Sequence, residues 1–173
     1  MVQSVELLVD ADTDAAVRAE WRTLWDAGLP SLARVSAVSN RPHITLFVAR
    51  DIPAEVDESL VRALGAADFP VTLGGLLLFG GRHVTLARAV VPSRRLLTLH
   101  RQVWDLASPH LDVPAHIAPG QWTPHVTLSR RLAASDLPEA LRLIDRPEIR
   151  GHAMGLRRWD GDAKREWALT LPP

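Results

Sequence analysis

The sequence predicts an internally duplicated α+β fold, in which two antiparallel sheets face a central cleft and the helices lie outside. Three segments of the first half recur in the second half, in the same order and at offsets of 79, 82 and 80 residues. The matched pairs are 21–26 with 100–105, 43–46 with 125–128, and 75–79 with 155–159. Ordered matches at nearly one offset indicate an internal repeat. Each half also ends in two strands joined by a tight turn, which favours antiparallel sheets over a doubly wound parallel sheet. We therefore expect residues 1–173 to form a single domain of two pseudo-symmetric lobes.

The pattern of the first half predicts two strand–helix units followed by a hairpin. The first helix is expected between a cap at Asp12, Thr13 or Asp14 and a stop at Gly28, with Trp21 on its apolar stripe. The expected elements are a strand over 2–9, this helix, the first histidine strand (motif at 43–46) running to about 49, a helix over 53–64, and strands over 70–79 and 82–91 that meet at Gly80-Gly81.

The second half predicts the same order without the leading strand. Ser93 is expected to cap its first helix, and a loop rich in Pro and Gly precedes its histidine strand. The expected elements are a helix over 93–108, a loop over 112–122, the second histidine strand (motif at 125–128), a helix over 136–144, and strands over 148–159 and 164–171 around Asp160-Gly161-Asp162.

Composition excludes several classes of protein. The chain contains no Cys, so disulfides, thiolate zinc sites and thiol nucleophiles are excluded. Twenty basic residues balance twenty acidic ones, which argues against a partner such as an extended nucleic-acid duplex. The N-terminus lacks the basic and apolar regions of a signal peptide, and no apolar run is long enough to span a bilayer. We expect a cytoplasmic, monomeric protein that does not bind membranes.

Two similar strands carry the residues that indicate chemistry. Pro-His-Ile-Thr-Leu at 42–46 returns as Pro-His-Val-Thr-Leu at 124–128. Residues two apart share one face of a strand. The imidazole and the hydroxyl of each copy therefore point the same way, while the apolar residues point into a core. Two such faces turned towards each other would form a symmetric site for acid–base chemistry on an anion.

The residue types in these strands suit acid–base chemistry on an anion such as a phosphate ester. Imidazole can act as a general base or a general acid because its unperturbed pKa lies near 6.5. His43 and His125 are therefore the catalytic candidates, in an order that the sequence leaves open. The hydroxyls of Thr45 and Thr127 can donate hydrogen bonds to phosphoryl oxygens. This chemistry requires no metal, no other cofactor and no covalent intermediate.

A third copy of the motif, at 83–86, has no counterpart in the repeat. His83 lies on the last strand of its half, where the other half carries Glu-Trp-Ala-Leu at 166–169. The paired histidines are therefore His43 and His125. His83 remains a candidate for substrate binding.

The paired motifs resemble those of the two-histidine (2H) phosphoesterases, which include the 2′-5′ RNA ligase and RNA 2′,3′-cyclic phosphodiesterase group. The resemblance covers most of the chain, because the flanking elements repeat as well. It implies that the histidines are acid and base and that the threonines bind phosphate. Arg130 completes a His-x-Thr-Leu-x-Arg pattern found in the second motif of bacterial RNA ligase-like members.

Two further residues are candidates for substrate binding. Strand alternation places Arg130 off the histidine face unless the strand bends, so it either contacts phosphate or ends the strand in solvent. Phe47 shares the face of His43 by the same alternation, so it either stacks on a base or packs in the core. Trp122 is a weaker stacking candidate, and His100 is expected to be a surface or loop residue.

These observations predict a metal-independent phosphodiesterase acting on 2′,3′-cyclic phosphates, of RNA ends or small nucleotides, or on 2′-5′ linkages. The natural substrate, and the choice between hydrolysis and ligation, stay open. One alternative is a non-catalytic module that binds phosphate or an RNA end. A second alternative is a metal hydrolase with His43, His83 and His125 as ligands, although the chain has no H-E-x-x-H or H-x-H-x-D pattern.

Overall fold

The computed structural model describes residues 2–64, 67–80, 82–109, 111–144 and 147–169. Its strands form one seven-stranded sheet in the order β2-β1-β6-β3-β4-β5, with β7 paired to β6, and all strand pairs among the described residues are antiparallel. The strands are β1 (Gln3–Val9), β2 (His43–Ala49), β3 (Asp68–Gly80), β4 (His83–Val90), β5 (His125–Ala133), β6 (Ile149–Asp160) and β7 (Arg165–Leu169). The helices are α1 (Ala11–Asp26), α2 (Ala54–Leu64), α3 (Arg94–Ala107) and α4 (Leu137–Leu143), with 3-10 turns η1 (Leu32–Arg34), η2 (Ala115–Ile117) and η3 (Ala134–Asp136).

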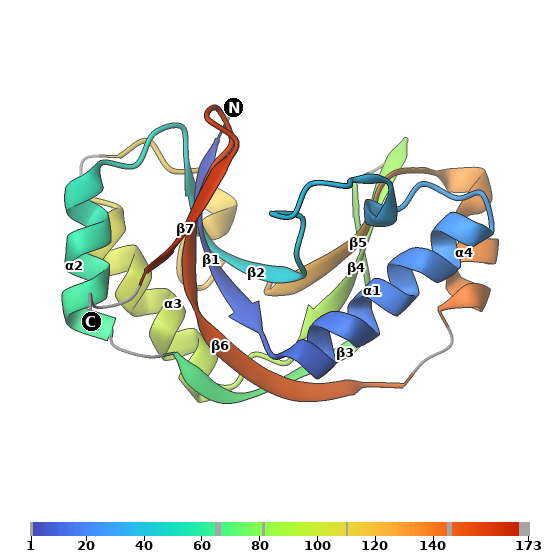
Figure 1. Ribbon diagram of the computed structural model, residues 1–173, viewed down its shortest axis with the longest axis horizontal. Helices are drawn as coiled ribbons and strands as arrows, with labels where there is room; N and C mark the ends of the chain where they lie inside the picture. Colours follow the sequence, from blue (N-terminus) through green and yellow to red (C-terminus); the bar gives the residue numbers. More distant parts are fainter. Residues whose placement is uncertain (1, 65–66, 81, 110, 145–146, 170–173) are drawn as a thin grey trace.

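Two long strands divide this sheet into two lobes. Strands β3 and β6 pair through their first halves, 68–73 with 149–154, and then separate. The second half of β6 lies between β1 and β7, whereas the second half of β3 pairs with β4. Helices α2 and α3 lie on one side of the molecule, and α1 and α4 on the other (Figure 1). The predicted α+β class is confirmed, with the two expected sheets joined through β3 and β6.

The spatial counterpart of β4 is β1. In one lobe β1 lies between β2 and β6, and in the other β4 lies between β5 and β3. The sequence repeat instead aligned β4 with β7, which pairs on the opposite edge of β6 from β1. The N-terminal strand β1 therefore takes the place, between a histidine strand and β6, that the sequence repeat predicted for the C-terminal strand β7.

Each histidine strand contains a bulge at the same position of its motif. Glu6 pairs with Thr45 but the preceding Val5 pairs with Phe47, so β2 holds one extra residue there. In the other lobe Ala87 pairs with Thr127, and the preceding residue of β4 pairs with Ser129. Such a bulge breaks the alternation of faces and bends the strand. The residues beyond each bulge therefore face differently from what alternation predicts.

Most of the expected elements are present, with shifted ends. Helix α1 begins earlier than expected, because the Asp10 side chain caps it by accepting a hydrogen bond of 2.8 Å from the Thr13 amide. Gly28 follows α1 with a φ of 76°, as a helix stop requires. Gly81 of the predicted hairpin turn and residues 170–171 of the last expected strand lie outside the described residues. Among the described helices, none is both long and apolar enough to cross a bilayer.

Candidate active site

The two predicted histidines come together where the lobes meet. Strand β2 lies against β5, and the charge of His43 acts on the ring of His125. Both rings are half-buried, as are Thr45 and Thr127. We call the sheet surface that carries these four side chains the histidine face.

Both imidazole rings are held in the same way by the backbone. Nδ1 of His43 lies 2.6 Å from the carbonyl oxygen of Arg41, and Nδ1 of His125 lies 2.8 Å from that of Thr123. A carbonyl oxygen only accepts hydrogen bonds, so each Nδ1 carries a proton that it donates. The intervening residue is Pro in both motifs, and Pro favours the extended backbone before it. Nε2 is therefore the atom of each ring that is free for proton transfer.

Two tryptophans support the bulged strands. The indole Nε1 of Trp21 donates to the carbonyl oxygen of Thr127 over 3.0 Å, and that of Trp122 donates to the carbonyl oxygen of Thr45 over 3.1 Å. Each indole therefore satisfies a carbonyl at a strand position where a bulge disrupts the ladder. Trp122 thus has a supporting contact that the sequence did not predict.

His100 supports the same strand through Trp122. Its ring stacks on the Trp122 indole with centroids 3.9 Å apart, and its Nε2 lies 3.0 Å from the carbonyl oxygen of Ile117. Burial lowers the pKa of His100, although its contact with Ile117 acts in the opposite direction. The expectation that His100 lies at the surface is wrong, since it is only 2% exposed. Its alignment with the core residue Trp21 in the repeat was the signal for burial.

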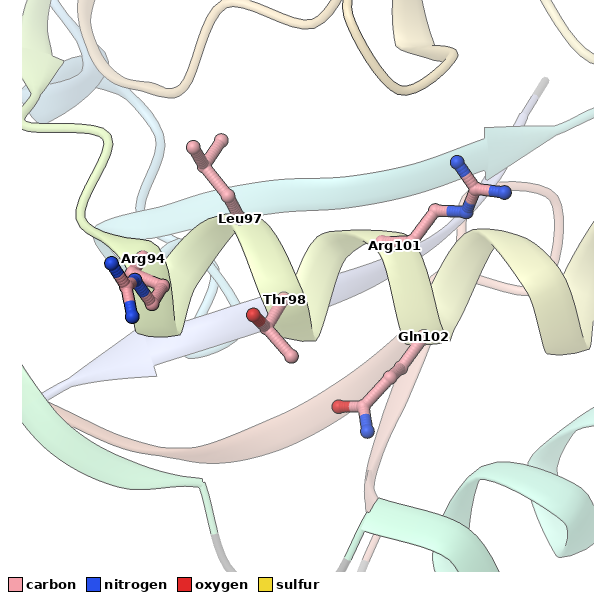
Figure 2. A pocket seen from close by; sticks show the side chains of 5 residues that line it. All are labelled: Arg94, Leu97, Thr98, Arg101 and Gln102. Carbon is pink, nitrogen blue, oxygen red and sulfur yellow. The ribbon is translucent and has the colours of Figure 1, made fainter.

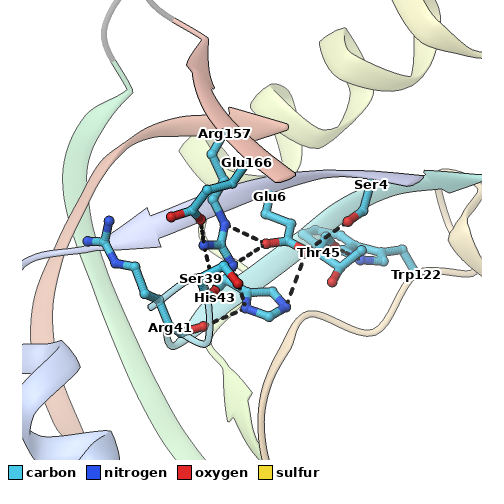
Figure 3. A network of polar contacts seen from close by, with 9 residues as sticks. All are labelled: Ser4, Glu6, Ser39, Arg41, His43, Thr45, Trp122, Arg157 and Glu166. Atoms are coloured by element: carbon cyan, nitrogen blue, oxygen red, sulfur yellow. Dashed lines mark hydrogen bonds and ion pairs between the residues drawn. The ribbon is translucent and has the colours of Figure 1, made fainter. Parts of the chain in front are cut away.

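A buried carboxylate, that of Glu6, lies next to the His43 ring (Figure 3). Glu6 Oε1 lies 3.5 Å from His43 Nε2 and accepts a hydrogen bond of 2.7 Å from the Ser4 hydroxyl, while Oε2 accepts one of 2.7 Å from Arg157 Nε. Burial acts to raise the pKa of Glu6. The positive charges of His43 and Arg157, with hydrogen bonds from Ser4 and Arg157, outweigh burial and hold this pKa below its usual value. Glu6 is therefore an ionised neighbour of the catalytic candidate.

Arg157 links this carboxylate to the last strand. Its Nη1 donates to Glu166 on β7 and, over 3.0 Å, to the carbonyl oxygen of Ser39. Its Nη2 lies 3.4 Å from Nδ1 of His43. The sequence analysis missed this network. The available signal was Glu6 itself, the one charged residue of the strand Gln3–Val9.

The neighbouring sheet residues of His125 on β3 and β4 are apolar. Ala87 lies opposite Thr127 in the sheet, and Leu77 lies opposite Ala87. The ring of Phe79 contacts the imidazole with centroids 4.6 Å apart. Burial lowers the pKa of His125, the hydrogen bond to the Thr123 carbonyl raises it, and the charges of His43, Arg130 and His116 lower it further. The net effect is a pKa below 6.5.

The other three predicted residues have different surroundings. Phe47 is fully buried and packs edge-on against Trp104, with ring centroids 6.1 Å apart. Its expected position on the histidine face is wrong, because the bulge turns it into the core. The matching bulge brings Arg130 close enough for its charge to act on His125. His83 is exposed on β4, opposite Ala133.

The comparison with family models identifies the group to which this chain is related. Residues 13–163 match the model described as the 2′-5′ RNA ligase superfamily. The chain belongs to this superfamily. A search of curated proteins found no significant match.

Solved structures of other proteins share the superfamily's fold with this chain. E. coli LigT in its apo form has a TM-score of 0.60 and 15% identity, over 96% of this chain and 93% of LigT. LigT complexed with 3′-AMP has a TM-score of 0.56 and 16% identity, over 96% and 95% of the two chains. Kluyveromyces marxianus Usb1 with uridine monophosphate has a TM-score of 0.56 and 15% identity, over 98% of each chain. At these identities the likeness establishes the fold alone.

Among the residues that the structure describes, neither a metal-ligand cluster nor the surface hollow on α3 offers a competing site. Within the described ranges, no group of three or more His, Asp or Glu residues lies close enough together to hold a metal ion, so His43, His83 and His125 do not form one. A hollow on the outer side of α3 contains no predicted site residue (Figure 2). It is lined by Arg94, Leu97, Thr98, Arg101 and Gln102. The histidine face therefore remains the candidate active site.

Proposed function

We propose that this protein is a metal-independent phosphodiesterase that opens 2′,3′-cyclic phosphates by general acid–base catalysis with His43 and His125. The main observation behind the proposal is that the backbone holds the imidazole rings of His43 and His125 in the same way. Each Nδ1 donates to a backbone carbonyl two residues earlier, so both Nε2 atoms are available. One Nε2 can take a proton from water while the other gives a proton to the departing ribose oxygen.

Phosphate binding is assigned to the two threonines. Thr45 and Thr127 stand two residues after the histidines on the same strands, and both are half-buried. Their hydroxyls can donate hydrogen bonds to the non-bridging oxygens, where negative charge accumulates during the reaction. Arg130 adds positive charge near His125, which favours an anionic ligand at this position.

The substrate class proposed is an RNA end or a small nucleotide with a cyclic phosphate. LigT has been solved with 3′-AMP and Usb1 with uridine monophosphate. Hydrolysis of a 2′,3′-cyclic phosphate yields a phosphomonoester of this kind. The superfamily relationship therefore supports a nucleotide ligand for this chain, and the two-histidine arrangement supports turnover of its cyclic form.

A substrate screen in the presence of EDTA tests the proposal. The substrates are a 2′,3′-cyclic mononucleotide, an RNA oligonucleotide with a cyclic 3′ end, and a 2′-5′-linked dinucleotide, with product mapping for each. We expect hydrolysis of at least one cyclic phosphate at an unchanged rate after exhaustive chelation. Activity that EDTA removes and zinc or manganese restores would favour a metal hydrolase. Nucleotide binding without turnover of any substrate would favour a non-catalytic module.

A further inference from the structure

The third copy of the His-x-Thr motif, at 83–86, has no role in the reaction proposed above. We propose that His83 and Thr85 form a second phosphate subsite, which binds the phosphodiester one nucleotide upstream of the cyclic phosphate in a single-stranded RNA end. This inference rests on the proposed function, because it assigns a ligand group to the surface beside the same reaction centre.

Strand pairing places both side chains on the same side of the sheet as Thr127. Ala87 lies opposite Thr127 on β5, and β4 pairs with β3 in an unbroken register from Ala87 to Val84. Residues two apart share one face of a strand, so Thr85 and His83 follow Ala87 on the histidine face. This face therefore continues along β4, which runs beside β5 (Figure 1).

Phe79 connects this part of the face to the reaction centre. It pairs with Thr85 across the ladder between β3 and β4, and its ring contacts the His125 imidazole with centroids 4.6 Å apart. Side chains that lie directly opposite each other on neighbouring strands are close enough to interact. A single side chain therefore separates Thr85 from the His125 ring.

The spacing along β4 suits two successive phosphates. Thr127 is the proposed ligand of the cyclic phosphate, and Thr85 lies two residues along β4 from Ala87, the partner of Thr127, which is a step of about 7 Å. Successive phosphates of an extended RNA strand are separated by a similar distance. A strand whose cyclic phosphate reaches Thr127 can therefore place its next phosphate at Thr85.

Both side chains are available to donate hydrogen bonds to a phosphate. A threonine hydroxyl is a donor, and an imidazole carries at least one N–H group in either protonation state. Thr85 is half-buried and His83 is exposed. Within the described ranges, no hydrogen bond or ion pair engages either side chain. Both groups are therefore free for a ligand.

Strand β5 adds positive charge next to Thr85. The strand pairs on either side leave two residues, Arg130 and Arg131, opposite the single residue Thr85. Arg131 has a φ of 60°, a left-handed conformation that residues other than glycine rarely adopt. Both arginines are exposed, and the charge of Arg130 acts on the His125 ring. Two cationic side chains on this short segment favour an anionic ligand beside them.

The corresponding position of the other lobe does not suit a phosphate. Strand β1 takes the place of β4 there, and Ser4 corresponds to Thr85, because each lies two residues before the residue that pairs with the motif threonine. The Ser4 hydroxyl, however, donates to the Glu6 carboxylate over 2.7 Å. The negative charge of Glu6 would repel a second phosphate. The upstream phosphate is therefore expected on the β4 side.

Two substrates that differ only in a 5′-phosphate test the subsite, because this group takes the place of the upstream phosphodiester. They are a nucleoside 2′,3′-cyclic phosphate with and without the 5′-phosphate. For the wild type we expect a roughly tenfold lower KM with the 5′-phosphate, the usual effect of a hydrogen bond to a charged group, at a similar kcat. His83→Ala and Thr85→Val should each remove most of this difference, by raising the KM of the phosphorylated substrate.

The control for Thr85→Val is Thr98→Val. It removes an exposed threonine hydroxyl from the outer side of α3 (Figure 2) and should preserve the difference between the two substrates. Equal KM values in the wild type, or a difference that survives both His83→Ala and Thr85→Val, would overturn the subsite. Because both substrates would still be hydrolysed, the proposed function would stand.

A dinucleotide that ends in a cyclic phosphate separates RNA from small nucleotides. Its upstream phosphate is a diester, and it should show the same low KM as the 5′-phosphorylated substrate, with the same loss in His83→Ala. An advantage confined to the 5′-phosphorylated mononucleotide would overturn the assignment to RNA ends.

Equilibrium binding gives the same comparison without turnover. Calorimetry measures the Kd of a nucleoside 3′-phosphate and of a nucleoside 3′,5′-bisphosphate. The wild type should bind the bisphosphate roughly tenfold more tightly, and His83→Ala and Thr85→Val should lose this preference. Equal affinities in the wild type would overturn the subsite. The expected preference in a protein that hydrolyses no cyclic phosphate would contradict the proposed function alone.

Discussion

At the scale of single residues, Phe79 covers the ring of His125, one of the two catalytic candidates. Burial is the largest cause of the lowered His125 pKa. Phe79→Ala should expose the ring and raise this pKa towards 6.5. The limb of the kcat–pH profile that reports the ionisation of His125 should therefore move up by roughly half a pH unit, whether His125 acts as base or as acid.

The control for this measurement is the next residue along β3. Leu78 pairs with Leu86, on the opposite side of the sheet from Ala87 and Thr85. Leu78→Ala should leave both limbs of the profile in place. An unchanged limb in Phe79→Ala would mean that other groups set the protonation of His125.

At the scale of secondary structure, the bulged strands depend on indole hydrogen bonds. Trp122→Phe keeps an aromatic ring against His100 and removes the Nε1 donor to the Thr45 carbonyl. We expect the free energy of unfolding to fall by about 1 kcal/mol, the usual contribution of one hydrogen bond. Turnover should fall roughly tenfold, because Thr45 and His43 share the strand and small displacements are costly in a catalytic site.

An exposed tryptophan provides the matched control for this variant. Trp25 on α1 is 52% exposed, so Trp25→Phe should change neither stability nor turnover. Chemical denaturation and steady-state kinetics measure both effects. Equal results for the two variants would show that the indole bond does not support the strand.

The same bulges explain which part of the strands the sequence could predict. Alternation correctly paired His43 with Thr45, because the bulge comes only after Thr45. It failed at Phe47, where two consecutive apolar residues both enter the core and leave no polar signal of the change. Arg130 was assigned conditionally for the same reason. A bulge depends on pairing with β1 or β4, which local periodicity does not contain.

At the scale of the whole molecule, the repeat predicted the lobes but not how they are completed. The aligned offsets correctly paired the two histidine strands. They could not show that β1 takes the place equivalent to β4, because strand order follows from long-range pairing. The network next to His43 depends on that placement, since Glu6 and Arg157 are 151 residues apart in sequence. We propose that residues 1–173 form a single domain of two lobes. The lobes share one arrangement of strands but differ in the charged residues next to their histidines.

Substitution of each histidine, with EDTA present throughout, tests the central claim most directly. Turnover of a 2′,3′-cyclic nucleotide is compared for wild type, His43→Ala, His125→Ala and His83→Ala. The first two variants should each lose about 10²–10⁴-fold in kcat, the usual contribution of a positioned acid or base, with a smaller change in KM because Thr45 and Thr127 remain. His83→Ala should keep its kcat, with at most a modest rise in KM. Wild-type kcat in either of the first two variants, or an equal loss in His83→Ala, would contradict a two-histidine mechanism centred on His43 and His125.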